Sequence, residues 1–327
     1  MRAAAHSPRA SRAGASGLAL VTGAHGFIGR HVARQLKADG WAVVGIGHGS
    51  WDEREWRAWG IDRWHDATIA VDVLSALGIV PDLVIHCAGT STVTAALQHP
   101  GREFERTVGS TEAVLEAMRR FWPKSLLVYP SSGAVYGEAA ALPIAETERV
   151  APISPYGTFK DQAEQLCRLY EHRYGVRSVL LRIFSVYGPR LRKQLLWDAC
   201  RKLQVGDATF QGTGQEVRDW IHVDDLARLI APLAAAPRPE DPVPVINVGT
   251  GAGTTVFDVV HLIADAFGLA GEPNFTGERR SGDPAAFVAD ISRARALGWT
   301  PVVPVAQGVV DYVRWFRTSQ VDLHTHP

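Results

Sequence analysis

The chain alternates short apolar runs with longer segments in which apolar residues recur every three or four positions. Short runs that are largely apolar are typical of strands buried on both faces of a sheet. These runs are residues 18–21, 40–45, 81–89, 124–130, 178–184 and 245–248. Helical spacing appears at residues 28–36, 104–121, 156–174 and 256–267. Strands that alternate with helices form βαβ units, so the pattern predicts an α/β fold with a doubly wound parallel sheet.

Past residue 184 this regular alternation stops. The pattern there predicts a helix at 195–203, a glycine-rich stretch at 206–214, a strand and helix at 218–235, a proline-rich connection at 237–244 and a polar loop at 279–284. We expect these segments to build a smaller, discontinuous C-terminal substrate lobe over the carboxyl ends of the strands, because ligands bind there in open α/β sheets.

The expected domain division follows from this change of rhythm. Residues 1–17 are rich in Ala, Arg and Ser and lack the apolar core of a signal peptide, so we expect a disordered tail. The sheet domain is predicted at 18–184 plus 217–250, and the smaller lobe at 185–216 plus 251–320.

A tryptophan-rich stretch interrupts the first half of the chain. Trp51, Trp56, Trp59 and Trp64 lie among charged residues. We interpret this stretch as a surface loop and short helix with aromatic anchors.

The amino-acid composition limits the kinds of partner and environment that the chain fits. Lys plus Arg and Asp plus Glu number 34 each, so the formal net charge is zero, which argues against a nucleic-acid binder. Cys87, Cys167 and Cys200 are widely spaced, and this fits a reducing cytoplasm rather than a disulfide framework or a metal site. No apolar run reaches about 18 residues, so no membrane span is predicted.

The first strand and helix are joined by a glycine-rich turn. Gly23, Gly26 and Gly29 are spaced three apart between the apolar run at 18–21 and the helical pattern that follows. Glycines allow a tight turn close to a pyrophosphate, and the helix start offers free N–H groups to it. The G-x-x-G-x-x-G spacing differs from the G-x-G-x-x-G fingerprint, and a chance turn is the alternative. The layout predicts a dinucleotide site.

Tyr156 and Lys160 form the strongest chemical pair. Ser154 and Pro155 suit a helix start, so the pair shares one face of the predicted helix. An ammonium beside a phenol stabilises the phenolate, so we expect a lowered pKa that makes the tyrosine a usable general acid and base. The alternative is a surface pair on an amphipathic helix.

Ser131 and Ser132 close the strand at 124–130, at the ligand edge of the sheet. A hydroxyl there could hydrogen-bond a substrate oxygen, and a turn or capping serine is the alternative.

These motifs together resemble the extended short-chain dehydrogenases/reductases of the NAD-dependent epimerase/dehydratase family, such as the UDP-glucose/galactose 4-epimerases. The resemblance covers residues 18–316. It rests on the glycine triplet, His86-Cys87-Ala88-Gly89, the segment 131–137 (SSGAVYG), the Tyr156/Lys160 pair and the segment 218–225 (RDWIHVDD). Such a family implies a Rossmann domain that binds NAD or NADP.

The resemblance also implies roles for individual residues. Ser132, Tyr156 and Lys160 would be catalytic, and the last two would also contact the cofactor. The other implied cofactor contacts are Gly23, Gly26, Phe27, Ile28, Gly29, Asp66, Ala67, His86, Ala88 and Gly89. The implied substrate contacts are Ser132, Ser185, Arg218, Arg280 and Asp283, and the two guanidinium groups suit the diphosphate of a sugar nucleotide.

Two departures from the family pattern bear on the reaction and on the substrate. Gly133 and Ala134 stand where the family's 4,6-dehydratases carry an acidic pair, which argues against water elimination. Ser185 replaces the family's asparagine, which weakens the case for its standard contact with the substrate diphosphate.

The third departure concerns the adenosine ribose of the cofactor. The second strand ends without a carboxylate, and Gly47 leaves room for a 2′-phosphate. His48 and Ser50 could donate hydrogen bonds to that phosphate, and Arg30 or Arg54 could add charge. We therefore expect NAD or NADP, with NADP tolerated or slightly favoured.

The sequence thus favours an epimerase that acts on a nucleotide-diphosphate sugar through a transient 4-keto sugar, with Tyr156 as acid and base. The alternatives are an NADPH-dependent reductase of a 4-keto-6-deoxy sugar nucleotide and a non-catalytic protein that senses NAD(P). The family implies a homodimer paired through the helices at 104–121 and 156–174.

Overall fold

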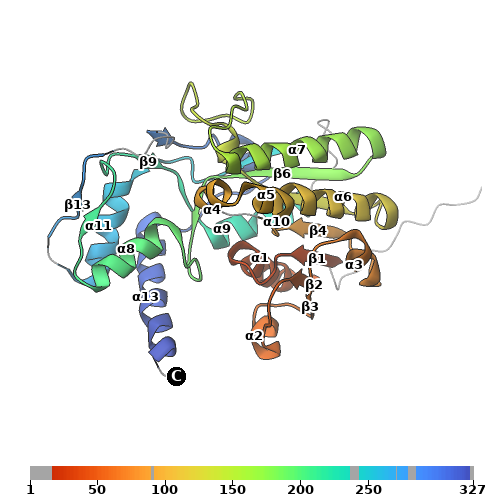
Figure 1. The fold of residues 1–327 in the computed structure, drawn as a ribbon, viewed down its shortest axis with the longest axis horizontal. Helices are drawn as coiled ribbons and strands as arrows, with labels where there is room; N and C mark the ends of the chain where they lie inside the picture. The colour runs from red at the N-terminus through yellow and green to blue at the C-terminus, as the bar shows by residue number, and fades with distance from the viewer. Residues whose placement is uncertain (1–16, 90–91, 236–242, 270, 279–284, 325–327) are drawn as a thin grey trace, which may run out of the picture.

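The computed structural model describes residues 17–89, 92–235, 243–269, 271–278 and 285–324. At its centre lies a seven-stranded sheet in the order β3-β2-β1-β4-β5-β6-β11, with every neighbouring pair parallel (Figure 1). The predicted doubly wound Rossmann sheet is confirmed. Its strands are β1 (Leu18–Thr22), β2 (Ala42–Gly47), β3 (Arg63–Asp66), β4 (Leu83–His86), β5 (Leu126–Ser132), β6 (Arg177–Ile183) and β11 (Val245–Val248).

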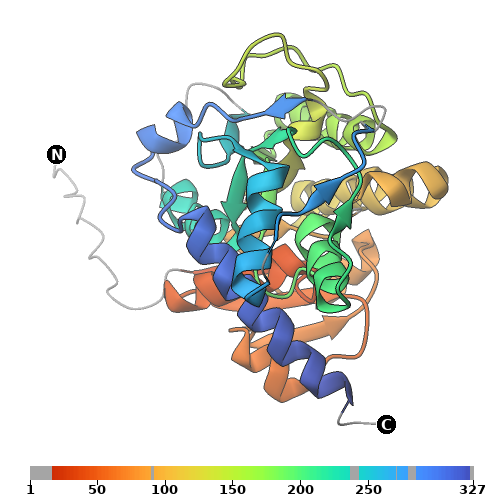
Figure 2. The same cartoon turned by 90° about the vertical axis from the view of Figure 1, so that its left-hand side faces the viewer.

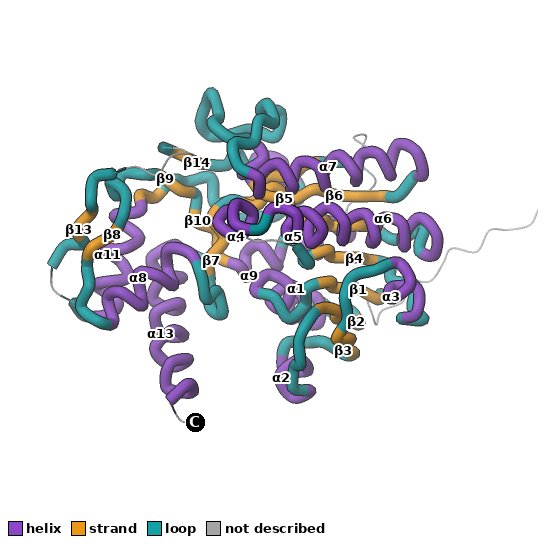
Figure 3. The backbone as a smooth tube through the Cα atoms, in the orientation of Figure 1, coloured by secondary structure: helices purple, strands orange, loops and turns teal. Residues whose placement is uncertain are grey.

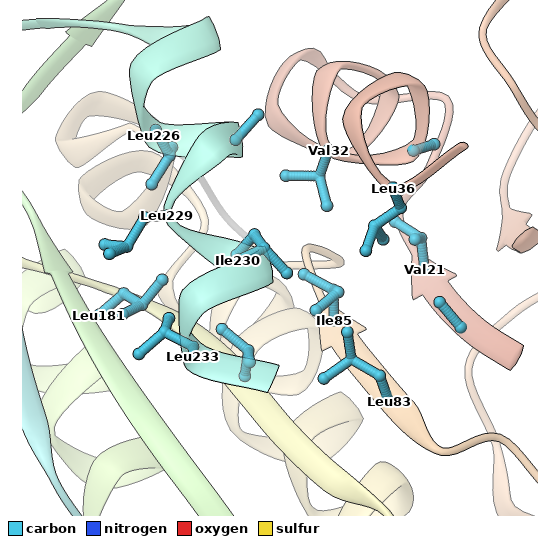
Figure 4. Close-up of a cluster of buried hydrophobic side chains, with 14 of the residues drawn as sticks. Val21, Val32, Leu36, Leu83, Ile85, Leu181, Leu226, Leu229, Ile230 and Leu233 are labelled. Carbon is cyan, nitrogen blue, oxygen red and sulfur yellow. The ribbon is translucent and has the colours of Figure 1, made fainter. Parts of the chain in front are cut away.

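Helices cover both faces of this sheet because the strand side chains are apolar on both. One face packs against α1 (Phe27–Ala38), α9 (Val223–Arg228) and α10 (Ile230–Ala235), as Figure 4 shows for a cluster that includes Val32, Leu83 and Ile230. The other face packs against α3 (Val71–Ala76), α6 (Ser110–Phe121) and α7 (Pro155–Tyr174).

The second lobe lies at one end of the sheet, on the left in Figure 1 and towards the viewer in Figure 2. Its core joins α8 (Gln194–Gln204), α11 (Val256–Phe267) and α13 (Val305–His324). Short strands edge it (Figure 3): β7 (Ser185–Tyr187) with β10 (Trp220–His222), β8 (Thr209–Phe210) with β13 (Asn274–Phe275), and β9 (Val217–Arg218) between β12 (Thr254–Thr255) and β14 (Ala286–Phe287).

The division into two domains remains a proposal, with one refinement. The segment that includes α12 (Ser292–Ala296) was expected in the smaller lobe, yet Ala294 and Trp299 pack into the core beneath α9 and α10. We assign that segment to the sheet domain.

Several elements differ from the pattern seen in the sequence. The edge strand β3 and the long helix α13 were not predicted. The stretch expected as one helix at 104–121 is α5 (Pro100–Phe104), a π-helical turn at Glu105–Gly109 and then α6, and it follows α4 (Val93–Gln98). A single 3₁₀ turn, Gly133–Val135, follows β5.

The tryptophan-rich stretch does contain a short helix, α2 (Glu53–Ala58). Its anchors are internal, since Trp51 and Trp56 are buried in the core that also packs against α1. In the part of the chain that the structure describes, no helix has the length and apolar character needed to cross a bilayer.

Candidate functional site

The turn after β1 packs so closely that side chains are excluded from it. A Cβ on Gly29 would lie 2.3 Å from the carbonyl oxygen of Gly23, and one on Gly23 would lie 2.7 Å from the backbone nitrogen of Ala88. Gly23 has a φ of 63°, and its N–H donates to Ile46 O at 2.7 Å. The glycines therefore place the turn between the ends of β2 and β4. At this point the order of the strands reverses, with β2 on one side of β1 and β4 on the other.

The start of α1 leaves donors for an anion. Gly26 is the N-cap and supplies no side-chain hydrogen bond, and the first turn carries no acidic residue. Phe27 and Ile28 open the helix, so their N–H groups point out of its N-terminus together with the positive end of the helix dipole. This arrangement fits the pyrophosphate of a dinucleotide.

The ends of β2 and β3 bring the expected adenosine contacts together. Asp66 closes β3, and its Oδ1 accepts a hydrogen bond from the Gly49 N–H at 2.9 Å. The N–H of Ala67 donates to Gly47 O at 2.8 Å. His48 lies in the same loop and is exposed. Asp66, Ala67 and His48 thus lie together where β2 and β3 end, and their contact with a cofactor stays a prediction.

The space beside Gly47 is occupied. A Cβ on Gly47 would lie 3.1 Å from Cη2 of Trp64, and one on Gly45 would lie 3.2 Å from Cε3 of the same ring. These glycines make room for an indole, which gives a packing reason for glycine at both positions.

The Arg30 side chain also makes its contacts within the protein. It is buried, its Nη2 donates to His25 O at 2.5 Å, and its guanidinium lies between the rings of Trp51 and Trp59 at 5.2 and 5.3 Å. Its Nη1 is 3.7 Å from Glu55, and burial lowers the pKa of Arg30 to about 10. The guanidinium remains charged at neutral pH but is not a free phosphate ligand.

The three candidate catalytic residues meet where β5 ends and α7 begins. The Ser132 hydroxyl accepts from Ala134 N at 3.1 Å and acts on the pKa of the half-buried Tyr156. Lys160 is buried, and its Nζ donates to Pro130 O at 2.8 Å. Helix α7 begins as predicted, with Ser154 as N-cap, which fixes where Tyr156 and Lys160 point.

The expected fall in the pKa of Tyr156 is wrong in this structure. Burial raises the pKa of Tyr156, and the nearby Ser132 hydroxyl only opposes the rise. The Lys160 ammonium points at the Pro130 carbonyl instead of the phenol. Burial also lowers the pKa of Lys160 to about 8.

His86 supports the site from beneath and does not line it. Its ring is 1% exposed, with Nδ1 2.7 Å from Thr22 Oγ1 and Nε2 3.2 Å from Ser110 Oγ. Burial, followed by the charge of Lys160, lowers the pKa of His86 to about 3, so the ring is neutral. Ala88 and Gly89 continue from this strand end, and the Ala88 N–H donates to Thr22 Oγ1 at 3.2 Å.

The structure describes two of the residues that are expected to contact the substrate, besides Ser132. Ser185 opens β7, and its N–H donates to Asp219 O at 3.0 Å. Arg218 ends β9, and its side chain is half-buried. Arg280 and Asp283 lie outside the described residues.

Gly133 follows the candidate catalytic serine for a steric reason. A Cβ there would lie 2.6 Å from Cε1 of Phe287 and 3.3 Å from Cε2 of Phe184. The two phenylalanine rings pack together with centroids 4.7 Å apart. A larger residue after Ser132 would therefore collide with this pair.

The sequence analysis missed one buried ion pair beside the site. Glu164 on α7 and Arg182 on β6 are 1% and 3% exposed, and Nη2 of Arg182 is 2.7 Å from Oε2 of Glu164. A signal was available, because Glu164 follows Tyr156 and Lys160 at helical spacing on the same face.

Comparisons with known proteins identify the family of the chain. The model of the NAD dependent epimerase/dehydratase family matches residues 19–249. The UDP-glucose 4-epimerase of Mycolicibacterium smegmatis is 31% identical over 92% of this chain and 98% of its own.

Two solved structures have the same fold over nearly their whole length. The UDP-glucose 4-epimerase of Thermotoga maritima with UDP-glucose has a TM-score of 0.84 at 28% identity, covering 93% of this chain and 99% of that one. The UDP-glucose 4-epimerase of Bifidobacterium longum with NAD+ and UDP has a TM-score of 0.81 at 27% identity, with the same coverage.

Proposed function

The chain belongs to the NAD dependent epimerase/dehydratase family, and we propose that it is a 4-epimerase of a nucleotide-diphosphate sugar. The observation that carries the proposal is the meeting of Ser132, Tyr156 and Lys160 at the ligand edge of the sheet, beside the glycine turn.

The proposed mechanism assigns one task to each of these residues. Ser132 holds the sugar 4-hydroxyl, and Tyr156 takes its proton as the C4 carbon is oxidised to a ketone. A nicotinamide cofactor bound at the glycine turn would accept the hydride from C4 and return it to the other face of the ketone. After the 4-keto sugar turns over, Tyr156 gives the proton back to the new hydroxyl, and Lys160 stabilises the phenolate when it forms.

We propose a uridine diphosphate sugar as the substrate. The support is that solved relatives carry UDP-glucose or UDP. We propose that Arg218 and Arg280 bind the diphosphate, Ser185 and Asp283 complete that side, and Ser132 binds the sugar. Guanidinium groups form charge-assisted pairs with phosphate oxygens, which suits this role.

The cofactor is proposed to be NAD or NADP, held by the glycine turn and the start of α1. A relative with NAD+ supports NAD. The missing carboxylate at the end of β2 and the exposed His48 support tolerance of NADP. The contacts of Arg30 within the protein remove one reason to favour NADP.

The test is to incubate the purified protein with UDP-glucose or UDP-galactose and NAD and to follow the C4 epimers by chromatography. Formation of the second epimer without net change in NADH supports the proposal. The reductase alternative, supported by the same three residues, predicts stoichiometric loss of NADPH with a 4-keto-6-deoxy sugar nucleotide. The sensing alternative predicts cofactor binding and no turnover of either substrate.

We further propose a homodimer paired through α6 and α7. Apolar side chains are exposed on these helices and on the neighbouring α4: Leu97 is 62%, Phe121 37%, Leu169 47% and Tyr174 57% exposed. A second copy would cover them by an isologous contact. Light scattering at micromolar concentration checks this, and a monomer mass contradicts it. The proposed location is the cytoplasm.

A further inference from the structure

The end of β5 is held against α7 by two contacts on either side of one helical turn. Lys160 Nζ donates to Pro130 O at 2.8 Å, and Ser131 Oγ donates to Oε1 of Glu164 at 2.6 Å. Pro130 and Ser131 immediately precede Ser132. The position of the Ser132 hydroxyl relative to α7 is therefore set by two side chains of that helix.

Glu164 is in turn fixed by the next strand. Arg182 on β6 donates from Nη2 to Oε2 at 2.7 Å and from Nε to Oε1 at 3.1 Å, a two-pronged pair. The guanidinium lies over the ring of Tyr136, 4.7 Å from its centroid. The Tyr136 hydroxyl donates to Asn247 on β11 at 2.7 Å. These contacts link α7 to three neighbouring strands.

Stability alone is a weak reason for such a pair. Two apolar residues of similar volume often stabilise an interior as well as a buried ion pair does, because burial costs both charges their hydration. Here the carboxylate also accepts the Ser131 hydroxyl, which connects the pair to the strand end that carries Ser132. The pair therefore has a geometric role that apolar residues could not take over.

The pair also acts on the charge of Lys160. Burial is the largest influence on the pKa of Lys160 and lowers it, whereas Cys87, just after β4, and Glu164 and Cys167 on α7 act in the opposite direction. His86 also interacts with Lys160, but its ring is neutral. Glu164 is the carboxylate in this set, and its charge favours the ammonium form of Lys160.

We propose that Glu164 and Arg182 are positioning residues that hold the end of β5 against α7 and so align Ser132 with Tyr156 and Lys160. The inference rests on the proposed epimerase function, because it concerns the alignment of that site. Neither residue touches the reacting atoms, and their effect passes through Ser131 and Lys160.

The test compares two sets of substitutions in the contacts between β5, Glu164 and Arg182 with a matched control. Glu164→Leu combined with Arg182→Met removes both charges together, which avoids leaving one buried and unpaired. Ser131→Ala removes only the hydroxyl that joins β5 to Glu164. Ser125→Ala is the control, because Ser125 is also buried and donates to the Pro81 carbonyl, but it lies just before β5, at the opposite end of that strand.

Steady-state epimerase kinetics and melting temperatures are measured for all forms. We expect kcat to fall about 10²-fold in the double variant and about tenfold in Ser131→Ala, since a misplacement of about 1 Å costs on the order of 10² in rate. KM is expected to stay within about twofold, because the contacts proposed for the diphosphate are unchanged. Ser125→Ala should lower the melting temperature as much as Ser131→Ala does while leaving kcat unchanged.

The pH profile separates positioning from structure. Without Glu164 the pKa of Lys160 falls, so the loss of activity at high pH should begin at a lower pH in the double variant. A folded double variant with kcat within twofold of wild type overturns the inference. If that variant does not fold, equal kcat values for Ser131→Ala and Ser125→Ala overturn it. Wild-type protein that epimerises no sugar nucleotide overturns the proposed function instead.

Discussion

Replacing Tyr156 by phenylalanine removes one oxygen atom from the proposed site and leaves the ring in place. The hydroxyl lies near Ser132, and the side chain is half-buried at the start of α7. Loss of a hydrogen bond at this hydroxyl would cost folding about 0.5–1.5 kcal/mol, with the lower end expected for a group that water still reaches. Loss of general acid and base catalysis costs about 10² to 10⁴ in rate, or about 2.7 to 5.4 kcal/mol of barrier. Activity should therefore fall far more than stability.

The assay measures kcat for epimerisation of the UDP-sugar, the melting temperature, and the dissociation constants for NAD and UDP. Tyr170→Phe is the control, because Tyr170 is on the same helix, is buried, and donates its hydroxyl to Glu112 at 3.3 Å away from the site. We expect Tyr156→Phe to bind both ligands normally and to turn over at least about 10²-fold more slowly. A Tyr156→Phe variant within tenfold of wild type, or a Tyr170→Phe variant equally impaired, would refute the assignment.

The remaining predictions concern the cofactor, the substrate and the pH range. Gly29→Ala places a Cβ 2.3 Å from a backbone oxygen of the glycine turn and should weaken NAD binding more than tenfold by calorimetry, whereas Gly101→Ala, with open space around it, should leave binding intact. Arg218→Ala should weaken UDP binding by about 1.5–3 kcal/mol and NAD binding hardly at all, and equal affinities for UDP in both proteins would contradict its role. Gly47→Asp should shift the ratio of NADH to NADPH dissociation constants towards NADH, and an unchanged ratio would show that this loop does not read the ribose. Since the pKa of Lys160 is lowered to about 8, activity that needs its charged form should be complete well below that pH and decline as the pH rises through it; a rate that is flat to pH 10 would rule this out.

The strands of the sheet were predictable because burial on both faces demands an unbroken apolar run, and β11 and α11 have the bounds that the pattern indicated. β3 was not predicted because it is an edge strand whose residues, Arg63–Asp66, are all partly or fully exposed. An edge strand is held by backbone hydrogen bonds on one side, which leave no apolar signature in the sequence.

The candidate catalytic residues were found because their spacing within one helix and at one strand end is local. What the sequence could not reveal were contacts between segments that folding brings together. The indole of Trp64 fills the space beside Gly47, and the Lys160 ammonium turns towards the Pro130 carbonyl. Both facts depend on side-chain directions that spacing alone does not determine.

The contact between Gly133 and Phe287 limits the order in which this chain could acquire a different reaction. An acidic residue directly after Ser132 would need the volume that the Phe287 ring now fills. In a lineage drifting towards water elimination, or in a directed-evolution library with that aim, a smaller residue at 287 must therefore come first. Libraries randomised at 133 alone should return glycine, and those randomised at both positions should return correlated pairs.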